Sequence, residues 1–294
     1  MSGVANNPLF RPPAEADSLI LQLDQGCPYN LCTFCGMYRD LLYRRLPVEE
    51  ARLLIRHETR KVPDTNRVFL ADGDVMRRPF GELEALLREL GTDLPRLARV
   101  NVYATGRAIL DKTEDQLRAL RSLKLHTLYV GLESGDEETL LRVRKGETAA
   151  GMIEAGKRAQ HCGLHISVMI LLGLGGRERT CEHVHATAQA LNHMQPRLLS
   201  TLRVVPVPGT ELYDEIRAGR FEPLTEYEVV RELRSIMASL ALTHTVFRAN
   251  HTSNAMPTEG RLPRDQARLL TELDRLLQSN RLDRKTPGRM PLWL

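Results

Sequence analysis

The sequence lacks any apolar run long enough to cross a membrane. No stretch of roughly 18 or more apolar residues occurs in the chain, so no transmembrane helix is predicted. Residues 1–10 also lack the basic start and the apolar run of a secretion signal. We therefore expect a cytoplasmic protein that has no membrane partner.

Blocks of one charge sign are also missing. The 294 residues include 41 basic and 37 acidic ones, which are intermixed and leave a net charge of +4. A nucleic-acid groove would need a basic face or stripe, so nucleic acid is not an expected partner. Hydrophobic residues make up 42% and charged residues 27% of the chain, which is typical of a globular protein with its own core.

From residue 18 onward, short β-rich runs alternate with amphipathic helical patterns. This alternation is typical of βα units around a parallel sheet, so the predicted fold class is α/β. Helices are expected to begin near Pro47, Phe80, Thr113, Asp136, Thr148 and Glu178. Strands are expected at residues 18–23, 68–71, 98–103, 127–131, 165–172 and 198–205.

The alternating pattern ends after residue 205. Prolines and a glycine follow at residues 206–209, and no further strand is predicted. Helical patterns cover residues 225–242 and 263–277, and a polar, irregular stretch at 248–260 separates them. We therefore expect a flexible N-terminal segment at residues 1–17, a core at 18–213, and a helical C-terminal extension at 214–294 that covers the mouth of the core.

Cysteine is scarce, and the odd count of five argues against a disulfide scaffold. Three of the five, Cys27, Cys32 and Cys35, lie in one loop after the first predicted strand. Three thiolates can hold three irons of a [4Fe-4S] cluster and leave the fourth iron without a protein ligand. A structural zinc site normally takes four Cys or His ligands, and no nearby residue completes such a set. The loop therefore favours an iron-sulfur cluster over zinc or over three unmetallated thiols.

With this cysteine loop, the sequence resembles the radical S-adenosylmethionine (SAM) superfamily from about residue 18 to residue 213. Cys32, Phe34 and Cys35 match the family pattern, whereas the four residues between Cys27 and Cys32 are one more than usual. The resemblance implies a partial (βα)6 TIM-like barrel, a [4Fe-4S] cluster on the three cysteines, and Phe34 near the SAM adenine. The likeness is greatest to the single-cluster, single-domain branch that includes oxygen-independent coproporphyrinogen oxidase-like proteins.

The segment after the second predicted strand is Asp72-Gly73-Asp74. Relatives carry a Gly-Gly-Glu segment there that holds the SAM amino group, so the resemblance implies that Asp74 stands in for the glutamate. Gly73 would let the backbone approach closely, and a carboxylate suits an ammonium group. A plain strand-to-helix turn would explain the same residues.

Three later motifs resemble further SAM-binding segments. Glu133 and Ser134 follow the fourth predicted strand, where relatives contact the SAM ribose. Lys145 occupies the position of an arginine that meets the SAM carboxylate, although a solvated helix start would explain it equally. Gly173 belongs to a glycine-rich turn beside the adenine, and the glycine spacing there is not that of a dinucleotide-binding fingerprint.

Two regions are candidates for substrate contacts. Arg107 follows the third predicted strand and could bind an anionic group or pair with a surface carboxylate. The polar stretch after residue 247 offers Arg248, Asn250, His251 and Asn254, although loops with these residues are often only turns. We expect a small, polar or anionic organic substrate, and no catalytic residue is assigned.

The resemblance implies an enzyme that cleaves SAM reductively to a 5'-deoxyadenosyl radical, which abstracts hydrogen from the substrate. It also implies an external one-electron donor such as ferredoxin or flavodoxin. Cys162 and Cys181 are isolated, which argues against a second cluster, and the 26 residues before Cys27 leave no room for a cobalamin-binding domain. The alternatives are breakage of a different sulfur–carbon bond, an RNA-modifying enzyme, and a non-catalytic iron-sulfur sensor.

Overall fold

The computed structural model describes residues 10–288, which form two compact units. The first contains residues 10–30, 37–128 and 162–164, and the second contains residues 31–36, 129–161 and 165–288. Residues 1–9, the outer part of the expected flexible N-terminal segment, and residues 289–294 lie outside the described residues. Within the described residues, no helix combines the length and the apolar character needed to span a membrane.

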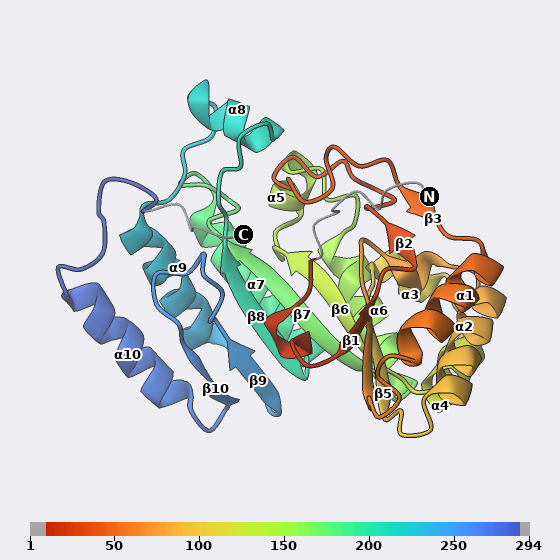
Figure 1. The fold of residues 1–294 in the computed structure, drawn as a ribbon. Coiled ribbons are helices and arrows are strands. Elements are labelled where there is room, and N and C mark those ends of the chain that lie inside the picture. Colours follow the sequence, from red (N-terminus) through yellow and green to blue (C-terminus); the bar gives the residue numbers. More distant parts are fainter. Residues whose placement is uncertain (1–9, 289–294) are drawn as a thin grey trace. The chain divides into compact units, whose positions relative to one another are not determined.

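The main sheet is mostly parallel and has eight strands in the order β1-β4-β5-β6-β7-β8-β9-β10, while β2 and β3 form a separate pair (Figure 1). Since β1 and β10 end this order, the sheet of the described residues is open and is not a closed barrel. The six predicted strands are confirmed, with ends shifted by a few residues. They are β1 (Leu19–Leu21), β4 (Arg67–Leu70), β5 (Arg99–Tyr103), β6 (Leu125–Glu133), β7 (His165–Leu172) and β8 (Leu198–Arg203).

In the first unit, parallel strands β1, β4 and β5 bury an almost continuous apolar run, as expected when helices cover a parallel sheet. Helices α1 and α2 pack against each other, and buried Glu89 of α2 accepts hydrogen bonds from Arg52 and Arg56 of α1. Besides β1, β4 and β5, this unit contains η1 (Pro13–Glu15), β2 (Asp24–Gln25), β3 (Arg44–Arg45), α1 (Val48–Thr59), η2 (Val75–Arg77), α2 (Phe80–Asp93), α3 (Gly106–Leu110) and α4 (Glu114–Ser122).

In the second unit, β7 and β8 pair in parallel over six residues, and α7 packs against both α6 and α9. Helix α9 begins at a capping box in which Thr225 accepts from the Glu228 backbone N–H, and the Glu228 side chain accepts from the Thr225 backbone N–H. The helices of this unit are α5 (Glu137–Arg142), α6 (Ala149–His161), α7 (Thr180–Met194), α8 (Glu211–Arg217), α9 (Glu226–Ser239) and α10 (Gln266–Gln278).

The prediction that no strand follows residue 205 is wrong. Strand β9 (Thr245–Arg248) pairs in parallel with β8, so α8 and α9 form one more crossover. Strand β10 (Glu259–Leu262) then pairs with β9 in antiparallel orientation. The region after residue 213 is therefore not purely helical, because its apolar residues, such as the fully buried Phe247, complete the sheet.

The described parts of both chain ends form hydrogen bonds with the body of the protein, whereas we expected a flexible segment at residues 1–17. In the first unit, the buried carboxylate of Glu15 accepts hydrogen bonds from Ser18 and from Asn101, which lies on β5. In the second unit, Arg203 of β8 donates to the Pro287 carbonyl. These contacts tie residues 13–15 and 287 to the core of their own unit.

Candidate active site

The loop that carries the cysteines runs between β2 and β3, which form its stem in the first unit. The two strands pair in antiparallel register, with Asp24 opposite Arg45 and Gln25 opposite Arg44. Arg78 lies under this pair, fully buried, and donates to the Asp24 carboxylate and to the carbonyls of Leu23 and Leu46. One guanidinium thus fixes both strands at the stem of the cysteine loop, as its planar fork of donors allows.

Gly73 lies directly against the cysteine loop. A Cβ atom at this position would come within 2.5 Å of both the Cys27 Cα and the Gly26 carbonyl oxygen, and within 3.0 Å of the Pro28 ring. Only glycine therefore permits this approach without a shift of the backbone. The sequence prediction that Gly73 serves a close approach is consistent with this contact, but the partner seen here is the cysteine loop itself.

Asp72 is buried, and its carboxylate holds the same loop. Its two oxygens accept hydrogen bonds from the Gln22 amide and the Tyr38 hydroxyl, each at 3.2 Å. Burial raises the pKa of Asp72, while hydrogen bonds from Gln22, Tyr38 and the Gly26 backbone oppose this rise. Burial likewise raises the pKa of Tyr38, so its hydroxyl remains a donor. Asp72 therefore positions the cysteine loop through its side chain.

Asp74 faces β5 and the helix that follows it. The Thr105 hydroxyl, at the N-cap of α3, donates to one Asp74 oxygen at 2.5 Å. Lys112 is also buried and donates to the Met76 carbonyl at 3.1 Å, which fixes the turn that follows Asp74. Burial lowers the pKa of Lys112, and the negative charges of Asp111 and Asp74 only partly oppose this. This part of the first unit therefore buries both a carboxylate and an ammonium group.

The remaining part of the cysteine loop belongs to the second unit. The Thr33 N–H donates to the Val143 carbonyl, and the Leu212 N–H donates to the Thr33 carbonyl, both at 3.0 Å. These bonds fix the backbone between Cys32 and Cys35, where Phe34 is half-buried. The loop is thus anchored at the segment between its last two cysteines.

All three loop cysteines are partly exposed and free of disulfide bonds, as cluster ligands must be. The Asn30 N–H donates to the Cys27 sulfur at 3.4 Å, a contact of the kind that tunes cluster potentials. Among the described residues, no three His, Cys, Asp or Glu side chains converge as a single metal ion would require. Cluster ligands bind different irons, and three free thiols in one loop are the donor set of a [4Fe-4S] cluster that leaves one iron without a protein ligand.

Lys145 and Glu133 form a mostly buried ion pair, with Nζ and Oε1 2.8 Å apart and side chains 13% and 12% exposed. Burial lowers the pKa of Lys145, but the negative charges of Glu133 and Cys32 outweigh it, and the pKa lies above its usual value. Glu133 and Arg144 both have left-handed backbone, with φ of 59° and 49°. Residues other than glycine that adopt this conformation occur preferentially at functional sites.

Ser134 is the start of a fully buried polar chain. Its oxygen accepts from the Asp136 N–H at 3.0 Å and lies 2.8 Å from His183 Nδ1, so its own proton can point at the histidine. The other ring nitrogen of His183 lies 3.5 Å from Glu232 Oε1. The Gly173 N–H donates to this same Glu232 oxygen at 2.6 Å. The chain connects the end of β6 to the turn after β7.

This arrangement differs from the expected ribose contact of Ser134, because the hydroxyl is buried and already bonded within the protein. Gly173 has φ of 80°, which glycine adopts without cost, and Glu232 holds its N–H from helix α9. Glu232 also accepts from the Thr180 hydroxyl at 2.5 Å. We conclude that Ser134 and Glu232 position the two turns.

The Glu232→Ala variant is expected to lower the free energy of unfolding by about 1–3 kcal/mol, because it leaves the buried Gly173 N–H without an acceptor. Glu232→Gln keeps one oxygen acceptor and should lose less. Arg231→Ala, an exposed change on the same helix, should have little effect. Urea unfolding measures all three, and equal stability of Glu232→Ala and the wild type would show that this chain does not stabilise the fold.

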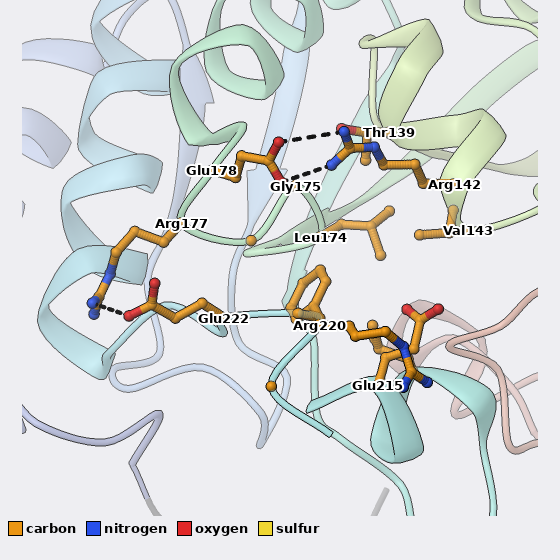
Figure 2. A pocket seen from close by; sticks show the side chains of 14 residues that line it. Thr139, Arg142, Val143, Leu174, Gly175, Arg177, Glu178, Glu215, Arg220 and Glu222 are labelled. Carbon is orange, nitrogen blue, oxygen red and sulfur yellow. Dashed lines mark hydrogen bonds and ion pairs between the residues drawn. The ribbon is translucent and has the colours of Figure 1, made fainter. Parts of the chain in front are cut away.

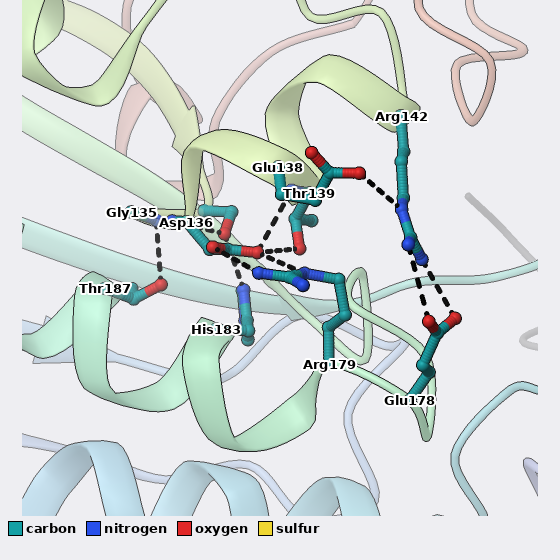
Figure 3. Close-up of polar contacts among 10 residues, drawn as sticks. Gly135, Asp136, Glu138, Thr139, Arg142, Glu178, Arg179, His183 and Thr187 are labelled. Carbon is teal, nitrogen blue, oxygen red and sulfur yellow. Dashed lines mark hydrogen bonds and ion pairs between the residues drawn. The ribbon is translucent and has the colours of Figure 1, made fainter.

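The neighbouring segment is fixed by charge (Figure 3). Arg179 makes two hydrogen bonds to the Asp136 carboxylate, at 2.8 and 2.9 Å, and Asp136 also caps α5 by accepting from Thr139. Burial, the largest influence, would raise the pKa of Asp136, but the bonds from Arg179 and Thr139 together hold it at about 2. The N-terminus of α5 is therefore locked to the start of α7.

A cavity of about 510 Å³ lies in the second unit, between the turn after β7 and the segment after α8 (Figure 2). Leu174, Val143 and Phe221 give it an apolar wall, and the exposed ion pairs Arg142–Glu178 and Arg177–Glu222 belong to its rim. None of the residues that line this cavity is one of the predicted SAM or substrate contacts.

The predicted substrate residues have the following contacts. Arg107 is exposed near the start of α3, and Asn250 is exposed after β9. Arg248 lies 4.0 Å from Glu259 on the neighbouring strand. His251 Nδ1 lies 2.9 Å from the Ser253 hydroxyl, and burial lowers the pKa of this histidine. Asn254 donates to the Thr201 and Ala249 carbonyls and so ties its loop to the sheet.

Several residues that shape the candidate site carry no signal in the sequence. Tyr38, Arg78, His183 and Glu232 act through partners far away along the chain, at separations of 34 residues for Tyr38–Asp72 and 49 for Ser134–His183. Local spacing cannot reveal such pairs. The buried charge of Arg78 and Glu232 becomes visible only in the folded structure.

The family model described as the Radical SAM superfamily matches residues 22–188. An uncharacterized methyltransferase of Pyrococcus horikoshii is 26% identical over 202 residues, which cover 66% of this chain and 41% of that protein. The chain thus spans about two fifths of the length of the curated relative.

Two solved structures share the fold. Methylornithine synthase has a TM-score of 0.53 and 15% identity, covering 92% of this chain and 83% of its own. Coproporphyrinogen III oxidase from Escherichia coli has a TM-score of 0.52 and 15% identity, covering 66% of this chain and 45% of its own. At such identities the likeness shows the fold alone, and it confirms the partial-barrel fold expected from the sequence.

The family match covers more than half of the chain and includes the three loop cysteines, the Asp72–Asp74 segment, Lys145 and Gly173. Members of this family use a [4Fe-4S] cluster and SAM, so the protein is an enzyme whose reaction class the comparisons leave open. The chain belongs to the radical SAM superfamily.

Proposed function

We propose that this enzyme uses a [4Fe-4S] cluster held by Cys27, Cys32 and Cys35 to cleave SAM reductively and to abstract hydrogen from a small, polar or anionic organic molecule. When bound, the cluster and SAM supply one-electron cleavage of a sulfur–carbon bond and a 5'-deoxyadenosyl radical. The chain itself supplies binding, orientation and exclusion of water, as in other cofactor enzymes.

The observation that carries the proposal is the mostly buried ion pair of Lys145 and Glu133, with Nζ and Oε1 2.8 Å apart. Lys145 can bind a SAM carboxylate with a donor that Glu133 does not use, because an ammonium group has three. Glu133 offers acceptors for ribose hydroxyls. In the first unit, Asp74 supplies a buried carboxylate for the SAM ammonium group, and Gly73 lies against Cys27.

Phe34 and Gly173 complete the proposed SAM contacts on the adenine side. Arg107, Arg248, Asn250, His251 and Asn254 are proposed as substrate contacts. The exposed Arg107 and Asn250 are best placed to meet a polar molecule, since Asn254 already holds its own loop.

Product analysis tests this function. The protein is reconstituted with iron and sulfide without oxygen, mixed with SAM and dithionite, and analysed by chromatography and mass spectrometry. We expect 5'-deoxyadenosine from the wild type and none from Cys32→Ala. If 5'-methylthioadenosine appeared instead, a different sulfur–carbon bond would break. A full cluster that neither binds SAM nor forms a product would contradict the proposal and favour the sensor.

A second candidate is methyl transfer, because the curated relative is named a methyltransferase. The same chromatograms would then contain S-adenosylhomocysteine. An RNA substrate would show as tight, salt-dependent tRNA binding.

The Lys145→Met variant is expected to bind SAM about tenfold or more weakly, because a charge-assisted hydrogen bond is worth about 1.5–3 kcal/mol. Equilibrium dialysis with labelled SAM measures this affinity. Lys157→Met removes an equal but exposed charge from α6 and should bind SAM normally. Folded Lys145→Met protein with wild-type affinity would show that Lys145 only stabilises Glu133.

A further inference from the structure

Residues 37–45 and Arg77 form a surface of the first unit beside the cysteine loop, here named the hairpin surface. Strand β3 at its end pairs with β2, which leads directly into Cys27 (Figure 1). A Cβ atom at Gly26 would lie 3.5 Å from the Tyr43 Cα and 3.7 Å from the Leu41 Cβ. The hairpin surface therefore adjoins the residue before the first cluster cysteine.

The hairpin surface exposes large apolar side chains. Leu42 is 93% exposed, Tyr43 is 39% exposed and Met37 is 37% exposed. Single exposed apolar residues are ordinary, but here three lie within seven residues of one folded loop. Aromatic residues and methionine are enriched at protein interfaces.

The hairpin surface also carries basic side chains. Arg39, Arg44, Arg45 and Arg77 are exposed, whereas Asp40 is the one acidic residue between positions 37 and 45. Among the described residues, Arg39 and Arg77 have no ion pair. Those of Arg44 and Arg45 with glutamates are long, at 3.7 and 3.8 Å, and partly exposed, so they neutralise little.

A cavity of about 380 Å³ lies between two of these arginines and the cysteine loop. It is lined by Pro28, which follows Cys27, and by Tyr43, Arg45 and Arg77. Two guanidinium groups and a phenol thus meet in one hollow next to the loop. An acidic side chain of a partner could enter this hollow and pair with both arginines.

We propose that the hairpin surface is the docking site of an acidic one-electron donor protein of the flavodoxin kind. This inference rests on the proposed function, because an electron donor is needed only if the enzyme's cluster must be reduced for SAM cleavage. In the step that the surface serves, the donor loses one electron and the cluster gains it. No bond of this chain forms or breaks.

Two other occupants fit the surface less well. A nucleic-acid backbone would pair with the arginines, but it would leave Leu42 and Met37 against phosphates and find one aromatic ring for stacking. A second copy in a two-fold dimer would bring the same basic residues together, which costs energy. An acidic protein can pair its carboxylates with the arginines and also pack apolar side chains against Met37, Leu42 and Tyr43.

The test compares two reductants on the anaerobically reconstituted full chain. Dithionite is a small reductant that needs no docking surface, while reduced flavodoxin is an acidic protein. Two variants are compared with the wild type. The first, here named the arginine variant, carries both Arg39→Glu and Arg77→Glu, and the second carries Leu42→Ser alone. The control, Arg88→Glu with Arg96→Glu, makes the same charge change elsewhere in the first unit.

We expect the flavodoxin-driven rate of 5'-deoxyadenosine formation to fall about tenfold or more in the arginine variant at low salt, and to fall in Leu42→Ser, with dithionite-driven rates unchanged. Added salt should lower the flavodoxin-driven rate of the wild type towards the rate of the arginine variant. The control should keep the wild-type rate.

An equal fall in the control, or unchanged flavodoxin rates in the variants, would overturn the docking site. So would a dimer of the wild type that Leu42→Ser dissociates in sedimentation analysis, or tRNA binding that the arginine variant abolishes. No product from the wild type with dithionite would instead show that the proposed function fails.

Discussion

Gly73→Ala is expected to lose its cluster. The new methyl group would meet the Cys27 Cα and the Gly26 carbonyl at 2.5 Å, and neither backbone atom can rotate away as a flexible side chain could. The loop must therefore move, and Cys27 with it. Overpacking of this kind costs about 1–3 kcal/mol, so we expect a folded protein whose iron content and visible absorbance after reconstitution are largely lost.

The matched control for this variant is Gly81→Ala. A Cβ atom at Gly81, in α2, would meet nothing within 4 Å, and alanine favours the helix. This protein should load its cluster normally and unfold at the same or a higher urea concentration. Wild-type iron content in Gly73→Ala would contradict the close packing that we assign to the cysteine loop.

Arg78→Met is expected to lower the free energy of unfolding by about 3–5 kcal/mol, because it leaves the Asp24 carboxylate buried without its partner. Two backbone carbonyls at the loop stem also lose a donor. Urea unfolding at neutral pH measures the loss. Arg88→Met, which breaks an exposed pair, should cost less than about 1 kcal/mol.

The loss in Arg78→Met should depend on pH. Burial already raises the pKa of Asp24 from its ordinary value of 3.8, and Arg78 partly offsets the rise. Without Arg78 the folded-state pKa rises further, so the folded protein binds a proton that the unfolded chain releases. The variant should therefore be least destabilised below pH 3.8 and lose stability as the pH rises through the new pKa. A pH-independent loss would contradict the assignment.

The sequence predicted the strands of the main sheet where their apolar runs are long, as at β7, whose predicted bounds are confirmed. It missed β9 and β10 for a physical reason. Each has four residues, β9 alternates buried and half-buried positions, and β10 contains a glycine and two charged residues. Such short strands carry little periodicity, and they are stabilised by their pairing in the sheet, β9 with β8 and β10 with β9.

Within the site, the cysteines were predictable because they are close in sequence, whereas the roles of Asp72 and Ser134 were not. Both follow strands at positions where relatives contact SAM, and both proved to bond to distant residues, Tyr38 for Asp72 and His183 for Ser134. The Lys145–Glu133 pair was predictable only in part. Each residue was predicted as a SAM contact, but their mutual ion pair appears only in the folded chain.

The central claim is that the three-cysteine loop holds a cluster with one iron open to SAM. Electron paramagnetic resonance of the reduced, reconstituted protein tests it directly. Binding of SAM to the open iron should change the spectrum in the wild type, and Cys32→Ala should give no cluster signal. A full cluster with an unchanged spectrum at saturating SAM would contradict the account, because it would mean that SAM does not reach the iron.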